Sequence, residues 1–254
     1  MRLQLATWPE VEAYLARSAN VILPVGSTEQ HGPNGLIGTD AICAEAVAWR
    51  VGERLDTMVG PTIGIGMAQH HMAFPGSMTF KPSTLLAVMR DCLLSLARHG
   101  FERVLVINGH GGNTPTLLAS FAEAQMELDA MAGMIQENGG HRPPLRCRVI
   151  NWWETPEVDR LSTELFGDAV GSHATPPEVA LTLALHPDRL DQRPLDPPVA
   201  PRANFHGASD FRARFPDGRI GSNPTLATPE SGRRILDAAV TELSAMAESF
   251  FNAG

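Results

Sequence analysis

The feature that most constrains the fold of this chain is an alternation of short apolar runs with segments of helical periodicity. The apolar runs are rich in β-branched residues and end near glycine or asparagine: VILPVG (21–26), MVGPTIGIG (58–66), RVLVING (103–109) and RCRVINWW (146–153). Runs of this kind are typical of buried parallel strands. Because helix-length segments separate them, the pattern predicts an α/β fold in which helices cover both faces of a mainly parallel sheet.

The helical segments share an apolar stripe and recognisable first residues. We expect Thr39 to cap the first of them, and Ser83 or Thr84 to start the second, which stops at Gly100. Further helices are predicted at about 114–131, 176–186 and 229–250. The stretch at about 187–229 is irregular and rich in proline and glycine, so we expect a long surface excursion that serves as a lid or a subunit contact.

Length and composition favour a single domain spanning residues 1–254, since a chain of this size with 43% apolar residues can bury a proper core. The chain has no run of about eighteen apolar residues, and Glu10 and Glu12 lie where a signal peptide would be uncharged. We therefore expect a soluble, cytoplasmic protein with no membrane partner. The three cysteines lie far apart and indicate buried thiols rather than disulfides or a metal knuckle.

The charge of the chain limits the class of partner. The formal net charge is −8, and no basic cluster interrupts it. Nucleic acids and anionic membranes attract basic surfaces, so neither is expected as a partner. A small molecule is the expected ligand.

Polar loops follow three of the predicted strands. STEQHG, GMAQHHMAFPGS and NGHGGN each come directly after an apolar run and contain glycine. The carboxyl ends of parallel strands meet at one edge of a sheet, where α/β proteins bind ligands, so these loops should converge. Convergence would bring Glu29, His31 and Asp40 of the first loop beside His110 of the third.

Two imidazoles and two carboxylates make a set of metal ligands. Nitrogen and oxygen donors without thiolate suit zinc, manganese or iron(II) in an open site, and a carboxylate can bridge two ions, so we expect one or two divalent ions per chain. Such ions activate water for attack on a carbonyl or phosphoryl group. Each carboxylate also has a structural explanation, because Asp40 could cap its helix and Glu29 could pair with an arginine. The two histidines on separate glycine-rich loops favour the metal site.

A further group of polar residues lies in GSHATPPEVALTLAL (171–185). His173 precedes the predicted helix and is placed to act as a general acid or base that delivers a proton to a leaving nitrogen. Glu178 falls in the first turn, where it could be a metal ligand or a catalytic carboxylate, or could simply be favoured by the helix dipole. His70 and His71 are adjacent and cannot both point at one site from a regular strand, so we expect one of them, taken as His70, to line the substrate pocket.

The motifs GSTEQHGPNGLIGTD, HHMAFPGSMTF, NGHGGN and SHA, in this order, resemble those of the creatininase family (creatinine amidohydrolases and their relatives) over about residues 23–185. The resemblance implies a three-layer α/β/α fold, a homo-oligomer that is a hexamer in several members, and a divalent-metal hydrolase acting on C–N bonds of cyclic or formyl amides. It also implies roles for single residues. Glu29 and His31 correspond to ligands of different ions, Asp40 to the bridging carboxylate and His110 to a further ligand.

The same resemblance implies that His173 is the catalytic histidine and that Ser77 contacts substrate, and we expect Asn113 of the NGHGGN loop to contact it as well. Creatininase itself carries a tyrosine and a metal-binding glutamate where Gly111 and Gly112 stand here, and its tryptophan just before the catalytic histidine is not evident in DAVGSHA. The chain therefore resembles a member other than creatininase itself. Glu178 could supply the missing carboxylate, or the site could hold one ion only.

The sequence thus predicts an enzyme: a metal-dependent hydrolase that cleaves a C–N bond of a cyclic amide, amide or formamide, with His173 as general acid or base. One alternative keeps the metal centre but hydrolyses a C–C bond of an inosose-like cyclic ketone. The other is a non-catalytic protein in which the metal anchors a small molecule.

Overall fold

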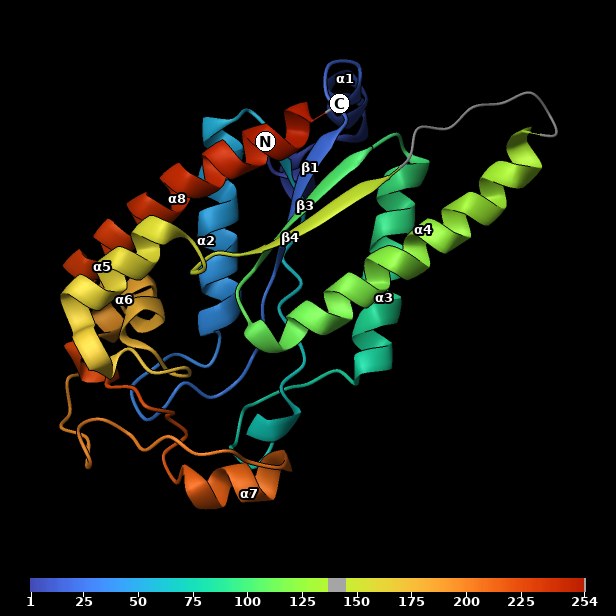
Figure 1. Ribbon diagram of the computed structural model, residues 1–254. Helices are drawn as coiled ribbons and strands as arrows, with labels where there is room; N and C mark the ends of the chain where they lie inside the picture. The colour runs from blue at the N-terminus through green and yellow to red at the C-terminus, as the bar shows by residue number, and fades with distance from the viewer. Residues whose placement is uncertain (137–144, 254) are drawn as a thin grey trace.

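The computed structural model of the protein describes residues 1–136 and 145–253, and within these ranges one parallel sheet has the strand order β2-β1-β3-β4 (Figure 1). The strands are β1 (Asn20–Val25), β2 (Met58–Val59), β3 (Arg103–Asn108) and β4 (Arg146–Asn151). Val21 pairs with Val104 and Val25 with Asn108, so the two central strands end together. The prediction of a parallel sheet is confirmed.

Helices cover both faces of this sheet. They are α1 (Trp8–Leu15), α2 (Thr39–Arg54), α3 (Pro82–Arg98), α4 (Thr114–Gln136), α5 (Pro156–Phe166), α6 (Pro176–Leu185), α7 (Gly207–Arg214) and α8 (Pro229–Asn252). In Figure 1, α2, α5, α6 and α8 lie on one side of the sheet and α3 and α4 on the other. None of the described helices is both long and apolar enough to cross a bilayer.

Alternate residues of the central strands face two separate cores, as the pleat of a strand requires. Ile22 and Leu105 pack in a core with side chains of α2, α5, α6 and α8. Val21 and Val104 pack in a second core with side chains of α1, α3 and α4. The sheet is therefore buried on both faces, and the three-layer α/β/α fold is confirmed.

Several predicted boundaries are wrong. β2 ends at Val59 rather than Gly66, because Pro61 has no N–H to give a ladder and the glycines that follow favour irregular backbone. Thr39 is the first residue of α2 instead of its cap, and its hydroxyl donates to the carbonyl of Leu36 at 2.6 Å. α3 begins at Pro82. The three cysteines, all within the described ranges, are free thiols, and Cys43 is buried while the other two are partly exposed.

The stretch at about 187–229 differs from the surface excursion that its composition predicts. Its middle part forms α7, which lies beside the short 3-10 helix η2 (Gln69–His71) at the carboxyl edge of the sheet (Figure 1). Phe211 and Phe215 are fully buried and pack with Phe74 in a third apolar cluster. The excursion therefore has a small core of its own and covers the loops at the strand ends.

Candidate metal centre

Glycines at the strand ends let a helix reach the edge of the sheet. Asp40 lies in the first turn of α2, directly beside Gly26 after β1 and Gly109 after β3. A Cβ atom on Gly109 would overlap the carbonyl oxygen of Asp40, and a Cβ atom on Gly26 would overlap the backbone of Ala41. The absence of these side chains thus places the carboxylate of Asp40 at the strand ends.

The four side chains expected to bind metal are gathered at this edge, and each is at most 8% exposed. The Nδ1 atom of His110 lies 3.2 Å from Oε1 of Glu29 and 3.3 Å from Oδ2 of Asp40. The Nε2 atom of His31 lies 3.1 Å from the other oxygen of Asp40, Oδ1. The carboxylate of Asp40 therefore extends between two imidazoles, with one oxygen near each.

Backbone carbonyls decide which ring nitrogen of these two histidines carries a proton. Nδ1 of His31 lies 3.0 Å from the carbonyl oxygen of Glu29, and Nε2 of His110 lies 3.0 Å from that of Met67. A carbonyl only accepts hydrogen bonds, so both of these nitrogens must donate. In the neutral ring the other nitrogen is then a bare lone pair, and in both residues it faces carboxylate oxygens. Histidines that bind metal are usually held in this way.

A positive charge is needed where these lone pairs meet. Within the described residues, Oε1 of Glu29 and Oδ2 of Asp40 are buried without a hydrogen-bond donor. Buried polar atoms are rarely left so. Burial alone would lower the pKa of His31, yet Asp40 and then Glu178 raise it to about 10, while His110 and His71 hold the pKa of Glu29 well below its usual range against the effect of burial. The residues present therefore fit one or two divalent cations.

Glu178 caps a helix and also lies beside the expected metal ligands. Its Oε1 atom accepts the N–H of Thr175 in a capping box at the start of α6, and the same atom lies 3.9 Å from Nε2 of His31. Burial, together with the charge of Asp40, raises the pKa of Glu178 to about 7 although His31 opposes the shift. A Cβ atom on Gly112 would overlap Nε2 of His110, so position 112 cannot provide a carboxylate in this conformation. Glu178 is placed to provide it instead.

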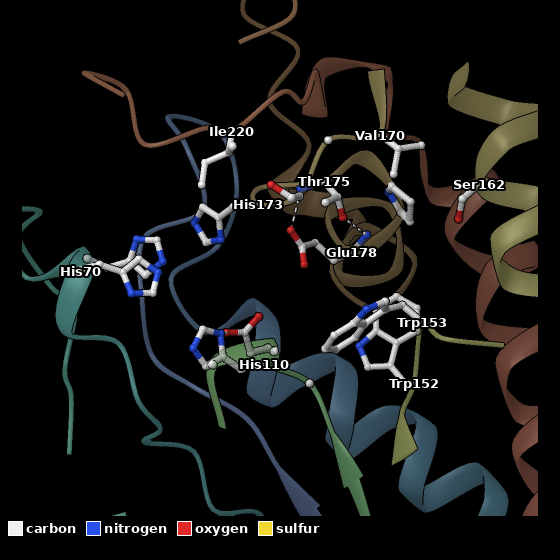
Figure 2. Close-up of a pocket in the computed structure, with 18 of the residues that line it drawn as sticks. His70, His110, Trp152, Trp153, Ser162, Val170, His173, Thr175, Glu178 and Ile220 are labelled. Carbon is white, nitrogen blue, oxygen red and sulfur yellow. Dashed lines mark hydrogen bonds and ion pairs between the residues drawn. The ribbon is translucent and has the colours of Figure 1, made fainter. Parts of the chain in front are cut away.

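A cavity of about 500 Å³ opens beside these residues. Figure 2 shows His70 on one side of it, Trp152 and Trp153 on the other, and His110 and Glu178 between them. Burial, followed by the neighbouring His71, lowers the pKa of His70 to about 4. Among the described residues that line the cavity there is no lysine or arginine.

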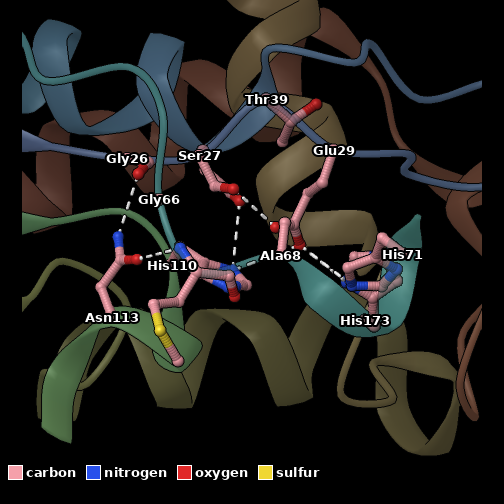
Figure 3. A network of polar contacts seen from close by, with 12 residues as sticks. Gly26, Ser27, Glu29, Thr39, Gly66, Ala68, His71, His110, Asn113 and His173 are labelled. Atoms are coloured by element: carbon pink, nitrogen blue, oxygen red, sulfur yellow. Dashed lines mark hydrogen bonds and ion pairs between the residues drawn. The ribbon is translucent and has the colours of Figure 1, made fainter. Parts of the chain in front are cut away.

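His173 also lines this cavity, and its ring stacks on that of His71 with the centroids 4.2 Å apart. Its Nδ1 atom lies 3.8 Å from Oε1 of Glu29 (Figure 3). Burial, followed by His71 and His31, lowers the pKa of His173 well below its usual range. A neutral histidine at this point is a base beside the carboxylates.

Two residues expected to contact substrate do not line the cavity. Asn113 is fully buried, donates to the carbonyl of Gly26 at 2.9 Å and accepts the N–H of Met67 at 2.9 Å, so its amide joins three loops instead of facing a ligand (Figure 3). Ser77 accepts the N–H of Gln30 at 3.1 Å. These positions correct the expectation for Asn113 and give Ser77 a structural contact.

Sequence reasoning missed His71, Gln30 and the two tryptophans. His71 is buried with Nε2 only 3.1 Å from Oε1 of Glu29, whereas His70, the histidine chosen from the sequence, lies farther out beside Phe205. Because they lie in η2 and not in a strand, the two adjacent rings do not point to opposite sides, and their centroids are 4.0 Å apart. The run WW at the end of a predicted strand was a usable signal, since aromatic side chains at that edge face a ligand site.

Comparisons with known proteins agree with this geometry. The family described as "Creatininase: Creatinine amidohydrolase" matches residues 4–247. Creatinine amidohydrolase of Pseudomonas putida is 30% identical over 256 residues, which cover 96% of this chain and 95% of that protein. The mycofactocin precursor peptide peptidase of Mycolicibacterium smegmatis is 35% identical over 113 residues, covering 42% of this chain and 45% of its own.

A third relative, the 3-dehydro-scyllo-inosose hydrolase of Thermotoga maritima, is 24% identical over 262 residues, covering 92% of this chain and 78% of that protein. Among solved structures, a manganese form of creatininase superposes with a TM-score of 0.84 at 27% identity and 99% coverage of both chains. A Zn-Zn form, a mutant, gives a TM-score of 0.81 at 27% identity, with 99% of this chain and 98% of that chain covered. The similarity thus extends over the whole fold.

Proposed function

Since the chain belongs to the creatininase family of hydrolases, we propose that it is a metal-dependent enzyme that cleaves a C–N bond of a small amide, cyclic amide or formamide. The observation that carries the proposal is the arrangement of His31 and His110. Each has one nitrogen fixed on a backbone carbonyl and the other facing the shared carboxylate of Asp40. In the neutral rings these nitrogens are lone pairs that face anionic oxygens, so each needs a cation, either a proton or a metal ion, to hold it there.

The expected ligands divide between two positions. Glu29 and His110 would hold one cation, His31 and Glu178 the other, and Asp40 would contact both. Zinc, manganese and iron(II) all suit these donors. Divalent cations bound there would supply Lewis acidity and lower the pKa of water so that it attacks a carbonyl carbon at neutral pH.

His173 would handle the proton in this reaction. Its Nε2 atom lies 2.8 Å from the backbone carbonyl of Gln30, so the neutral ring donates there and keeps a lone pair on Nδ1, on the side of Glu29. Nδ1 can accept a proton from the attacking water and return it to the departing nitrogen, which leaves as a neutral amine. The burial of His173 keeps the ring neutral and therefore available as a base.

The lining of the cavity favours a small substrate. Away from the expected metal ligands, its walls do not favour a phosphate group. Its lining combines aromatic side chains such as Trp153 with the acidic Asp159, and it offers no lysine or arginine among the described residues. A phosphate would lack a cationic partner on these walls. C–C bond hydrolysis of a cyclic keto-sugar is the alternative, favoured by the similarity to the Thermotoga maritima hydrolase over most of the chain. Homo-oligomeric assembly, a hexamer included, and a cytoplasmic location stay predictions.

The proposal is tested by metal analysis and a substrate panel on protein purified without added metal. The panel comprises creatinine, formamides, short peptide amides and inosose-like ketones, and we expect turnover of a C–N substrate. His110→Ala should lose bound metal and lower kcat by about a thousandfold or more, whereas the exposed control His99→Ala should change neither. A fully active His110→Ala protein that retains its metal would overturn the metal centre. Protein that binds metal but turns over no substrate in the panel would instead favour the non-catalytic binding protein.

A further inference from the structure

We propose that Gln30 is a positioning residue that fixes the tautomers of two buried histidines of this site: His71, which it removes from the set of metal ligands, and His173, whose bare nitrogen it keeps available for proton transfer. The other two buried histidines, His31 and His110, are the expected metal ligands. The inference rests on the proposed hydrolase function. It goes beyond that function because distance alone does not separate the four rings. Glu29, His71 and His173 have ligand atoms within 4.8 Å of one another, as do Glu29, His31 and Asp40.

The side-chain amide of Gln30 has only one possible orientation. Its Oε1 atom accepts the N–H of Gly32 at 2.8 Å, and its Nε2 atom donates to the carbonyl of Gly218 at 2.9 Å. A backbone N–H only donates and a carbonyl only accepts, so exchanging the two atoms would break both bonds. The residue is 7% exposed, and water cannot replace these partners freely.

This orientation fixes the proton of His71. The amide nitrogen of Gln30 lies 2.9 Å from both Nδ1 of His71 and Nε2 of His173, and the latter must donate to a backbone carbonyl 2.8 Å away. The second amide hydrogen is therefore left for Nδ1 of His71, which accepts, and the proton of the neutral ring is on Nε2. Nε2 lies 3.1 Å from Oε1 of Glu29. In the neutral ring this nitrogen carries the proton and has no lone pair there for a cation, so this tautomer excludes His71 as a ligand.

The same residue fixes the proton of His173. Nε2 of His173 lies 2.9 Å from the side-chain nitrogen of Gln30 and 2.8 Å from the backbone carbonyl of the same residue. A carbonyl only accepts, so Nε2 must itself carry the proton and donate it to the carbonyl. Its Nδ1 atom is then the bare nitrogen, and Nδ1 is the atom that lies toward Glu29 at 3.8 Å.

One glutamine therefore holds both stacked rings in the Nε2–H tautomer, so that His71 faces Glu29 with its N–H and His173 faces it with a bare nitrogen. Backbone carbonyls fix the tautomers of His31 and His110. Gln30 also joins the site to the excursion, since a Cβ atom on Gly218 would overlap its amide. Replacing Gln30 should leave the two carbonyl-held metal ligands in place and free the rings of His71 and His173 to take either tautomer.

The test is nitrogen NMR on zinc-loaded protein labelled with ¹⁵N-histidine, in which two-bond proton–nitrogen correlations distinguish the tautomers. In the wild type we expect Nε2–H for both His71 and His173, assigned by His71→Gln and His173→Gln variants. Gln30→Glu should move the proton of His71 to Nδ1, because a carboxylate only accepts, and Gln30→Met should give mixed tautomers. Gln125→Met, a change at a partly exposed glutamine of α4, is the control.

Metal content and kinetics complete the test. Gln30→Met should keep the zinc stoichiometry of the wild type and should lower kcat by about tenfold to a hundredfold with KM changed by less than about threefold, since a misplaced proton impairs proton transfer and not binding. Wild-type tautomer spectra or wild-type kcat in Gln30→Met would overturn the inference, as would Nδ1–H on His173 in the wild type. Zinc-loaded wild type that turns over no substrate would reject the proposed function instead, and the spectra would still decide the assignment of Gln30.

Discussion

Among single residues, the chemistry of the site depends on which ring nitrogen of each buried histidine is bare. His31 and His110 direct bare nitrogens at Asp40, and His173 directs one toward Glu29. Carbonyl oxygens of the polar loops and the amide of Gln30 enforce this pattern. The loops therefore contribute to reactivity through their main chain as well as through their side chains.

The position of Glu178 predicts how many ions the site holds. Glu178→Gln keeps an oxygen that can accept the N–H of Thr175, so α6 should start as before, but it removes the charge beside His31. We expect the bound metal to fall from two ions per chain to about one, measured by elemental analysis after dialysis.

Glu157→Gln is the matched control for this change, because Glu157 is an acidic residue in the first turn of α5 that pairs with the partly exposed Arg160 and lies outside the cavity lining. It should leave the metal content unaltered. Two ions per chain retained by Glu178→Gln would show that this carboxylate serves only as the helix cap.

The chain's spacing could predict residues that follow strands directly, and it predicted the cluster of Glu29, His31, Asp40 and His110 for that reason. It could not predict Gln30 as the centre of the network, because the partners of its side chain lie 41, 143 and 188 residues away. Asn113 was misjudged for a related reason: a buried amide that joins three loops has the same sequence signature as one that binds a ligand.

Among the structural elements, the excursion is held against the site by one buried arginine. Arg219 is fully buried, forms an ion pair with Asp217 at 2.7 Å, and donates to the carbonyls of Pro197, Pro198 and Ser222. Ser222 in turn donates to the carbonyl of His173 at 2.7 Å. The excursion is thereby coupled to the backbone of the proposed catalytic histidine.

Arg219→Met should loosen this element. The substitution fills much of the same volume but removes the ion pair with Asp217 and the donors to the carbonyls of Pro197 and Pro198, so the free energy of unfolding should fall by about 1–3 kcal/mol. Urea titration measures the loss, and limited proteolysis should cut within 187–229 faster than in the wild type.

Arg214→Met is the control, since Arg214 is exposed on α7 and its pair with Asp210 is at the surface. It should change stability by less than about 1 kcal/mol. Equal proteolysis rates for the two variants would contradict the role of Arg219.

Elements with a long apolar run or stripe could be predicted well from the sequence. The central strands and the helices after them have buried faces with the expected periods. The prediction failed for β2, whose β-branched residues continue past Gly60 into a loop, and for α7, whose burial depends on three phenylalanines that pack with η2. Such packing between distant segments has no local signal.

For the whole molecule, protons and metal ions would compete for the same histidine nitrogens. In metal-free protein, Asp40 and Glu178 raise the pKa of His31 to about 10 against burial, and Glu29 and Asp40 raise that of His110 in the same direction. Between pH 7 and 10 the folded chain therefore binds more protons than the unfolded chain, so the stability of the metal-free protein must fall as the pH rises.

This predicts opposite behaviour for two forms of the protein. Chelator-treated protein should melt about 5 °C or more lower at pH 9.5 than at pH 7, while the zinc-loaded protein should lose much less, because the cation replaces the protons. Scanning calorimetry of both forms gives the comparison. Metal-free His31→Gln should show a weaker pH dependence than metal-free wild type, and a chelated wild type equally stable at both pH values would contradict the assignment.

The two sides of the cavity come from different parts of the chain. The four clustered donors lie before residue 111, whereas Trp152, Trp153 and Ser162 on the opposite wall belong to the end of β4 and to α5. The proposed catalytic His173 and the proposed ligand Glu178 come later still, so the wall residues form a stretch of the chain that contains none of the proposed reactive groups. Natural variation at those wall positions, or a mutant library restricted to them, can therefore change which substrate binds and leave the expected metal ligands unaltered.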